Sequence, residues 1–320
     1  MLAACSDDGV SGAGTPAAGA AAGTAGASGA ATGARSGSGG SSAGGGSSNT
    51  GGSANGGSTS TVPATFVNAD AGGYALGPGI MGGGANPVVP AAASGCSVIV
   101  GVIRDFKAAN EPGGHPDFEY FFNPGFGVQG LVEATLGVDG KPVYTGLCEE
   151  GRASPVACPD GEETTTKANF DQWYRYVPNV NEPFLLYLKL ATTPGVHSFQ
   201  SSSFFPLDEK DGDGGAGHNF SFTTEWHVKF VYAAEQQFTF AGDDDVWVFV
   251  NERLAIDLGG VHARASQTLD LDTRATALGI ALGQEVSLDI FHAERHTTES
   301  NFGFETNIAF SQCGTVLADR

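Results

Sequence analysis

The sequence predicts an all-β fold, an antiparallel β-sandwich that follows a disordered N-terminal tether. Apolar and polar residues alternate with period two over many short stretches after residue 95, as half-buried strands require. Short turns separate most of these stretches, which favours antiparallel pairing. The residues before position 63 are, by contrast, dominated by Gly, Ala, Ser and Thr. A mixed α+β fold is the alternative.

Composition divides the chain into a short start, a linker and one folded domain, residues 1–5, 6–93 and 94–315. Up to residue 62 the linker carries only Asp7, Asp8 and Arg35 as charges and has no aromatic residue. Such a segment buries too little apolar surface to offset the entropy of ordering it, so we expect it to be disordered. A flexible coil of the roughly 57 residues that end at position 62 has an r.m.s. reach of about 40 Å. The linker is therefore predicted to tether the domain.

The start of the chain, Leu2-Ala3-Ala4-Cys5, resembles the lipobox of bacterial lipoproteins. In that motif the cysteine becomes the lipidated N-terminus, so we expect a lipid anchor to the membrane at Cys5. Ser6 follows the cysteine where an aspartate would direct retention in the inner membrane, which favours the outer membrane. The basic and apolar parts of a signal peptide do not precede the motif, and a chance match is the alternative.

Strand-like patterns fill the predicted domain. The expected strands cover residues 97–104, 184–190, 222–232, 238–240, 246–250, 253–258, 266–271, 285–292 and 302–310. The stretch 246–250, Val-Trp-Val-Phe-Val, is apolar on both faces of a strand, so we expect it inside a sheet that is covered on both sides. One short helix is expected at 169–175. Trp247 is expected in the core, with stacking on a sugar as the alternative.

Four cysteines remain if Cys5 is lipidated, and an even number in an exported chain predicts disulfides. They allow three pairings. We expect Cys148–Cys158, which are close in sequence, and Cys96–Cys313, which bracket the domain. No CxxC spacing is present, so zinc is not expected.

The formal net charge of −20 disfavours nucleic acid or an anionic membrane surface as a partner and favours cations. Solubility outside the cell is an alternative reason for this charge. No G-x-S-x-G, H-E-x-x-H or phosphate loop is present, and we expect no enzyme activity.

Three consecutive aspartates, Asp243, Asp244 and Asp245, stand directly before the apolar stretch 246–250. Unpaired carboxylates in a buried position are costly, so water, an arginine or a hard cation must compensate them. Calcium prefers oxygen ligands of this kind. Neighbouring side chains of a strand point to opposite faces, so Asp243 and Asp244 share one ion only if the peptide between them is kinked or cis. The alternative is an acidic β-turn held by backbone N–H groups.

A series of motifs runs through the domain in fixed order: HPDFE (115–119), DGKPVYTG (139–146), FDQWYR (170–175), FFPLD (204–208), HNFSFTTE (218–225), FTFAGDDDVWVFVN (238–251), IDLGGVH (256–262) and FHAERHTTESNF (291–302). Together they resemble the fibro-slime domain family of bacterial surface proteins and secreted factors of social amoebae. That family is similar to the lectin β-sandwich of the anthrax protective-antigen (PA-fourteen) type. The resemblance covers about residues 98–311.

The resemblance implies a calcium site. In the wider sandwich family an Asp-Asp pair with a cis peptide and an Asn from a later loop hold Ca²⁺, which with the pair binds sugar hydroxyls. This pattern places the metal ligands at Asp243, Asp244 and Asn301, with Glu299 and a carbonyl of residue 302 or 304 as further candidates. Asp245 stands where the family often has Gly, so which two aspartates bind stays open.

The predicted ligand-binding residues are Asp243, Asp244 and His262, the last with a hydrogen-bonded turn as the alternative role. His115, Asp117 and Glu119 form a weaker metal candidate, with structural hydrogen bonds as the alternative. The predicted function is that of an exported, surface-anchored or secreted module that binds glycans or extracellular matrix with Ca²⁺. A matrix protein that acts through protein contacts alone is the second hypothesis, and an exported polysaccharide hydrolase is a remote third.

Overall fold

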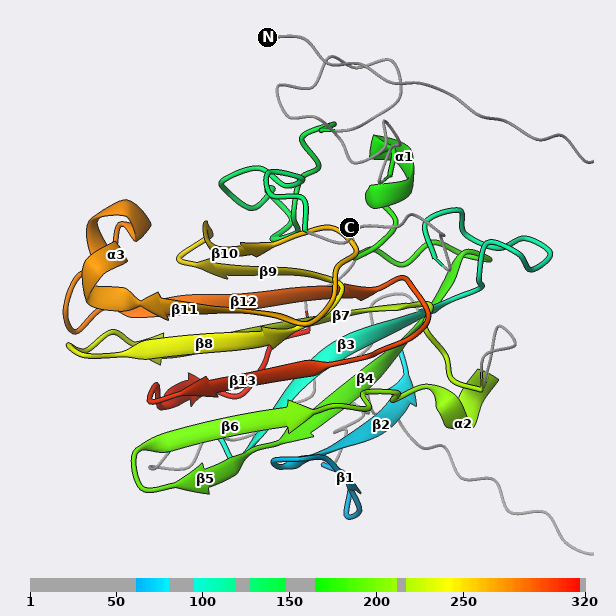
Figure 1. The fold of residues 1–320 in the computed structure, drawn as a ribbon. Coiled ribbons are helices and arrows are strands. Elements are labelled where there is room, and N and C mark those ends of the chain that lie inside the picture. The colour runs from blue at the N-terminus through cyan, green and yellow to red at the C-terminus, as the bar shows by residue number, and fades with distance from the viewer. Residues whose placement is uncertain (1–61, 81–94, 119–126, 148–164, 212–216, 317–320) are drawn as a thin grey trace, which may run out of the picture. The chain divides into compact units, whose positions relative to one another are not determined.

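Two antiparallel β-sheets stack face to face, which confirms the predicted all-β sandwich (Figure 1). The computed structural model describes residues 62–80, 95–118, 127–147, 165–211 and 217–316. All of these belong to residues 55–320, one of the two units into which the chain divides; the other is residues 1–54.

One sheet has nine strands and the other has five. The nine-stranded sheet has the order β1 (Val67–Asn68), β2 (Gly73–Gly79), β4 (Asn181–Lys189), β3 (Val98–Phe106), β7 (Phe222–Val231), β12 (Glu285–Glu294), β9 (Asp245–Val250) and β10 (Arg253–Leu258), with β14 (Phe310–Gln312) also paired to β7. The five-stranded sheet has the order β11 (Ala265–Asp270), β8 (Gln237–Gly242), β13 (Phe302–Thr306), β6 (Val196–Ser201) and β5 (Ala191–Thr193).

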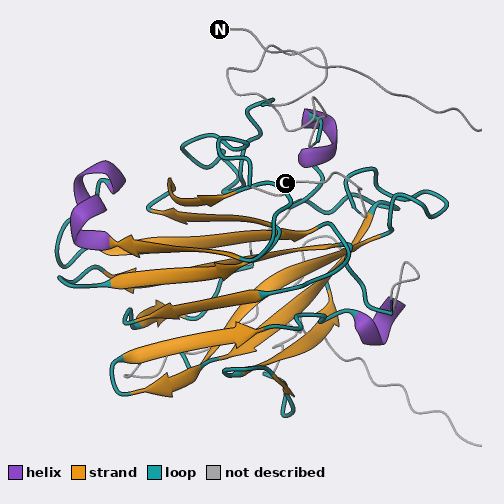
Figure 2. Ribbon diagram, viewed as in Figure 1, coloured by secondary structure: helices purple, strands orange, loops and turns teal. Residues whose placement is uncertain are grey.

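Short helices lie at the margins of the sheets (Figure 2). They are α1 (Lys167–Phe170), α2 (Asp208–Asp211) and α3 (Leu271–Leu278). In α3 the Asp270 carboxylate accepts a hydrogen bond from the Thr273 N–H, and Gly279 closes the helix in the left-handed conformation with φ 66°. These are standard helix-ending interactions. The sequence-based prediction missed α3 and placed α1 slightly too late.

Strand β9 supports the core on both of its faces. Val246, Val248 and Val250 belong to the main core between the two sheets. Trp247 and Phe249 point to the opposite face and pack into a second core. Each large apolar side chain buried in this way contributes about 1.5–3 kcal/mol. The prediction that 246–250 is covered on both sides, with Trp247 in the core, is therefore confirmed.

Loop segments cover the outer face of the nine-stranded sheet. Phe118, Phe170, Trp173 and Tyr174, of which Phe170 ends α1, belong to the same buried cluster as Trp247. Phe170 and Trp173 contact the Trp247 ring directly. The ring centroids of Trp247 and Phe170 lie 5.8 Å apart in an edge-to-face arrangement. This layer explains why β9 is apolar on both of its faces.

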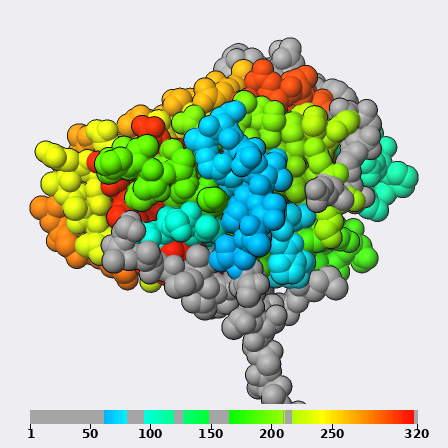
Figure 3. Space-filling view, turned by 90° about the horizontal axis from the view of Figure 1, so that it is seen from below, coloured from blue at the N-terminus to red at the C-terminus, as the bar shows by residue number. Residues whose placement is uncertain are grey.

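The folded part begins earlier than the boundary expected at residue 94. Residues 67–79, placed in the linker by composition, form β1 and β2, and β2 pairs with β4. Tyr74 packs edge-on against Phe204, with ring centroids 5.4 Å apart. Figure 3 shows this segment, in blue, spread over one face of the molecule. The expected strand 302–310 divides into β13 and β14, and the pattern did not predict β5 or β6.

Cys96 and Cys313 form a disulfide with a Cα–Cα distance of 5.4 Å, as predicted. The bond ties the chain just before β3 to the residue that follows β14. Cys5, Cys148 and Cys158 lie outside the described residues. Among the helices in the described ranges, none has the length and apolarity needed to cross a bilayer.

Removal of the Cys96–Cys313 bond is expected to lower stability by about 2–5 kcal/mol, because it closes a long loop in the unfolded chain. The sequence separation of the two cysteines is 217 residues. Denaturant unfolding of the wild type and of the Cys96→Ser/Cys313→Ser variant measures the difference. Adding reductant to the double variant isolates any contribution from other disulfides. Equal stability of the two oxidised proteins would contradict the expectation.

Candidate acidic site at the crossover between the sheets

The three aspartates occupy the point where the chain crosses from one sheet to the other. β8 ends at Gly242 in the five-stranded sheet, and β9 begins at Asp245 in the nine-stranded sheet. The peptide bond between Asp243 and Asp244 is cis, one of the two backbone conformations that the sequence predicted for a shared site. The exposed fractions of Asp243, Asp244 and Asp245 are 2%, 5% and 0%. The crossover therefore holds three buried carboxyl groups.

Asp243 and Asn301 contact each other directly, although 58 positions separate them. The Asn301 N–H donates to Asp243 Oδ1 and the Asn301 side-chain amide donates to Asp243 Oδ2, both at 2.6 Å. The Asp243 N–H in turn donates to the Asn301 carbonyl oxygen at 3.1 Å. A Cβ at Gly242 would lie 2.5 Å from that same carbonyl oxygen, so this close approach requires glycine. The structure thus brings together residues that the sequence paired.

Asp244 has a backbone donor, the N–H of Arg295, which lies 3.0 Å from its Oδ2 atom. Burial raises the pKa of Asp244 to about 8; Arg295 opposes the shift, and the charges of Asp245 and Asp243 add to it. Burial also raises the pKa of Asp243, while the hydrogen bonds from Asn301 act in the opposite direction. Both groups would be stabilised as carboxylates by a nearby cation.

Asp245 is held differently from its two neighbours. Its Oδ2 atom accepts a hydrogen bond from Arg295 Nε at 2.7 Å, and both side chains are fully buried. Its Oδ1 atom accepts from the Gly260 N–H. The Arg295 guanidinium also lies 4.7 Å from the centroid of the Trp173 ring. Of the three aspartates, Asp245 is therefore the one with an arginine partner of its own.

Two buried titratable neighbours of the aspartates were missed by sequence reasoning. Glu294 is fully buried, and burial together with the charges of Asp244 and Asp243 holds its pKa well above the usual range. His292 Nε2 lies 2.9 Å from the Asp243 carbonyl oxygen, and burial lowers its pKa to about 4, so the ring is neutral. Their period-two spacing after Leu288 and Ile290 was the signal that both face the interior.

His262 lies in the same region, but both of its ring nitrogens already contact backbone carbonyl oxygens. Nδ1 lies 2.8 Å from the Ala263 carbonyl oxygen, and Nε2 lies 3.1 Å from that of Leu258. The side chain is 6% exposed. A ligand contact by His262 would have to replace one of these two interactions.

The weaker candidate near residue 115 is a structural hydrogen-bond cluster. The Asp117 carboxylate accepts hydrogen bonds from Thr165 Oγ1 at 2.6 Å and from Trp173 Nε1 at 2.8 Å. His115 packs edge-on against Phe106. Glu119 lies outside the described residues. Among the residues that are described, no three His, Cys, Asp or Glu side chains are arranged to hold a metal ion; the predicted calcium set contains two carboxylates and an amide.

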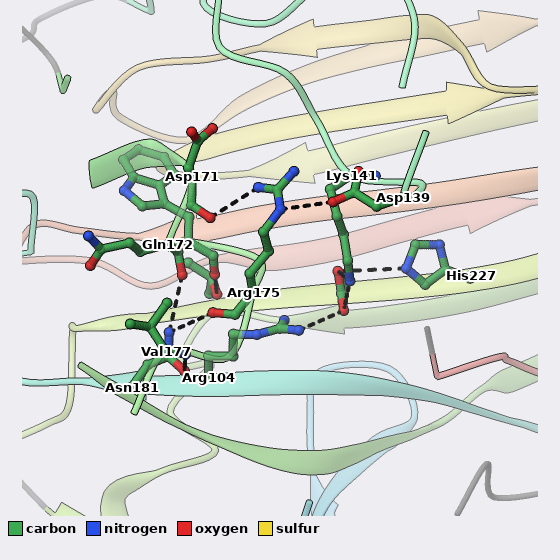
Figure 4. A network of polar contacts seen from close by, with 12 residues as sticks. Arg104, Asp139, Lys141, Asp171, Gln172, Arg175, Val177, Asn181 and His227 are labelled. Carbon is green, nitrogen blue, oxygen red and sulfur yellow. Dashed lines mark hydrogen bonds and ion pairs between the residues drawn. The ribbon is translucent and has the colours of Figure 1, made fainter. Parts of the chain in front are cut away.

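A separate polar network fixes the cover of the nine-stranded sheet (Figure 4). Glu225, on β7, accepts hydrogen bonds from Lys141 Nζ at 2.6 and 2.7 Å and from Arg104 Nη2 at 3.1 Å. His227 Nε2 lies 3.6 Å from Glu225 Oε2, and His227 Nδ1 lies 2.8 Å from Asp289 Oδ1. Despite burial, Arg104, Lys141 and His227 hold the pKa of Glu225 well below its usual range. Lys141 thereby ties the loop that carries it to the sheet.

Comparison with known proteins found relatives among curated sequences. The chain is 36% identical over 223 residues to protein psiC and 38% identical over 194 residues to protein psiD, both of Dictyostelium discoideum. These matches cover 64% and 58% of this chain but 42% and 37% of the relatives, so the chain spans less than half of their length. No family model matches. The solved structure of an α-xylosidase of Xanthomonas citri aligns at 8% identity over 35% of this chain and 14% of its own, with a TM-score of 0.22. This TM-score is too low to support any inference.

The network around His227 predicts a pH-dependent stability. Burial would lower the pKa of His227, but its hydrogen bond to Asp289 and its charge interactions with Asp289 and Glu225 outweigh burial, and its pKa is raised. The protonated ring therefore stabilises the fold fully below about pH 6.5, and this contribution is lost as the pH rises through the folded-state value. We expect His227→Gln to cost about 3 kcal/mol at pH 6 and less at pH 9, measured by urea unfolding.

The matched control is His197→Gln, which alters a partly exposed histidine on β6. This variant should show a small cost that is the same at both pH values. A His227→Gln cost that does not change between pH 6 and pH 9 would refute a charged His227 in the folded protein.

Proposed function

We propose that this protein is an exported, calcium-dependent carbohydrate-binding or adhesion module, with the ion held at the crossover between its two sheets. One observation carries the proposal. Asp243 and Asp244 are buried beside each other, and Asn301 contacts Asp243, while the arginine of the region pairs with Asp245. Two buried carboxyl groups thus stand where a cation would offset their mutual repulsion.

The residues present fit a hard cation. Calcium takes carboxylate, amide and backbone oxygens, and Asp243, Asp244 and Asn301 supply the first two kinds. The Asn301 side-chain NH₂ group faces Asp243 in this structure. To bind the ion, the side-chain amide would rotate so that its oxygen faces the ion instead. Glu299, exposed and 3.3 Å from the Asn301 amide nitrogen, is a further candidate ligand. A bound calcium would supply open coordination positions for sugar hydroxyls.

The proposed location is the cell surface or the medium outside it. The sequence Leu2–Cys5 resembles a lipobox, which supports a lipid anchor at Cys5. The Cys96–Cys313 disulfide supports an oxidising compartment. The fibro-slime resemblance supports a glycan or extracellular matrix as the partner, and the acidic net charge disfavours nucleic acid.

Calcium is expected to bind the full chain with about one ion per molecule and to raise the melting temperature, because it binds only the folded state. Asp244→Asn should weaken calcium at least about tenfold, which corresponds to about 1.4 kcal/mol. Titration calorimetry and metal analysis measure this affinity, and a glycan array with calcium or with chelator measures sugar binding.

The matched control is Asp171→Asn, which removes one charge from a partly exposed aspartate paired with Lys167; calcium affinity should stay unchanged. No calcium uptake by the wild type at millimolar concentration would refute the proposal. Calcium uptake without binding of any glycan would favour the matrix protein that acts through protein contacts. Release of sugars from a polysaccharide panel would favour a hydrolase.

A further inference from the structure

A hollow of about 230 Å³ opens beside Asn301, on the outer face of the five-stranded sheet. Asn301 contributes to its wall and also contacts Asp243. The hollow therefore adjoins the proposed calcium site. Sequence reasoning gave no indication of it, because its lining comes from five separate parts of the chain.

The hollow exists because two small residues, Gly303 and Ala241, stand side by side on the neighbouring strands β13 and β8. In the sheet register, Gly303 of β13 stands opposite Gln200 of β6 on one side and Ala241 of β8 on the other. Phe302 and Phe304 point into the core between the sheets, so Gly303 lies on the outer face. A Cβ at Gly303 would come within 3.0 Å of the Gln200 side chain. Because Gly303 has no side chain and Ala241 has only a methyl group, these two residues leave space above the strands for the hollow.

The walls carry hydrogen-bonding groups of both kinds. Asp70 holds one side: its Oδ2 atom accepts a hydrogen bond from the Ser202 N–H at 2.7 Å. Arg264, an exposed residue, is the one basic side chain among the residues that line the hollow. Within the described part of the chain, no ion pair involves Arg264. Its guanidinium is a planar, permanently charged donor that suits a carboxylate.

We propose that this hollow is the subsite for one sugar ring that carries a carboxylate, that is, a uronic-acid type residue of a glycan. The acid group contacts Arg264, and ring hydroxyls contact Asp70, Gln200 and Asn301. Pockets for drug-sized ligands have volumes of roughly 300–1,000 Å³, so the hollow admits a single ring. This inference rests on the proposed glycan-binding function and names the chemical class of its ligand.

Charge explains why a local cation is needed for such a ligand. The chain has a net charge of −20, which repels an anionic sugar at long range. At physiological salt this repulsion is screened beyond roughly 8 Å, whereas a direct guanidinium–carboxylate contact is not. Arg264, together with the proposed calcium, supplies the local positive charge that lets an acidic sugar bind in the hollow.

The test compares matched sugars by calorimetry in calcium: methyl glucuronide against methyl glucoside, and methyl galacturonide against methyl galactoside. The wild type is expected to bind at least one of the acids about tenfold tighter than its neutral partner. Arg264→Gln should remove that preference and keep calcium affinity. Arg253→Gln, which removes an exposed arginine of β10, should keep the preference. Ala241→Tyr should fill the hollow and weaken both sugars, with folding checked by its melting temperature.

Equal binding of acid and neutral sugars by the wild type would overturn the subsite and leave calcium-dependent binding intact. The same holds for an Arg264→Gln variant whose preference is unchanged. Failure of the wild type to bind calcium or any glycan would overturn the proposed function itself, and the subsite with it.

Discussion

Neutralisation of three adjacent buried carboxyl groups is the constraint on which the crossover between the sheets depends. Arg295 pairs with Asp245 inside the protein, and loss of one partner of such a buried pair costs about 3–5 kcal/mol. The arginine is therefore committed to Asp245 and to the cover of the nine-stranded sheet. Asp243 and Asp244 are left with N–H donors, whose partial charges offset burial only in part, as the raised pKa values of both groups show.

The geometry around β9 separates the pairing of Asp245 with Arg295 from the proposed binding of a cation by Asp243 and Asp244. Asp245 begins the strand on the face that carries Trp247, where loops cover the sheet. Asp244 lies on the connection before the strand, against the end of β12 and beside Glu294. Asn301 arrives directly before β13. Strands of both sheets thus position the candidate site, and groups held by rigid strands are placed more precisely than groups on free loops.

The predictable features were those with a strong local signal. The alternation and the doubly apolar stretch 246–250 predicted the sandwich and its covered strand, and the bracketing positions of Cys96 and Cys313 predicted their bond. Strand β1 was missed because it is very short, and β2 because its sequence is rich in glycine. Helix α3 was missed because its apolar residues are few. Glu294 was missed because an acid in a strand pattern usually indicates a solvent-facing position. The partnership of Asp245 with Arg295 depends on tertiary structure that no local pattern encodes.

Residues 67–79 contribute both to the edge of the nine-stranded sheet and to the hollow beside Asn301. β2 covers the edge of β4, and an uncovered edge strand is a point of aggregation. Asp70, between β1 and β2, reaches Ser202 and forms a wall of the hollow beside Asn301. A fragment that begins at residue 94 would lose the edge cover and this carboxylate together. The segment that composition assigns to a tether is therefore, in its last part, a structural component of the surface on which ligand recognition is proposed.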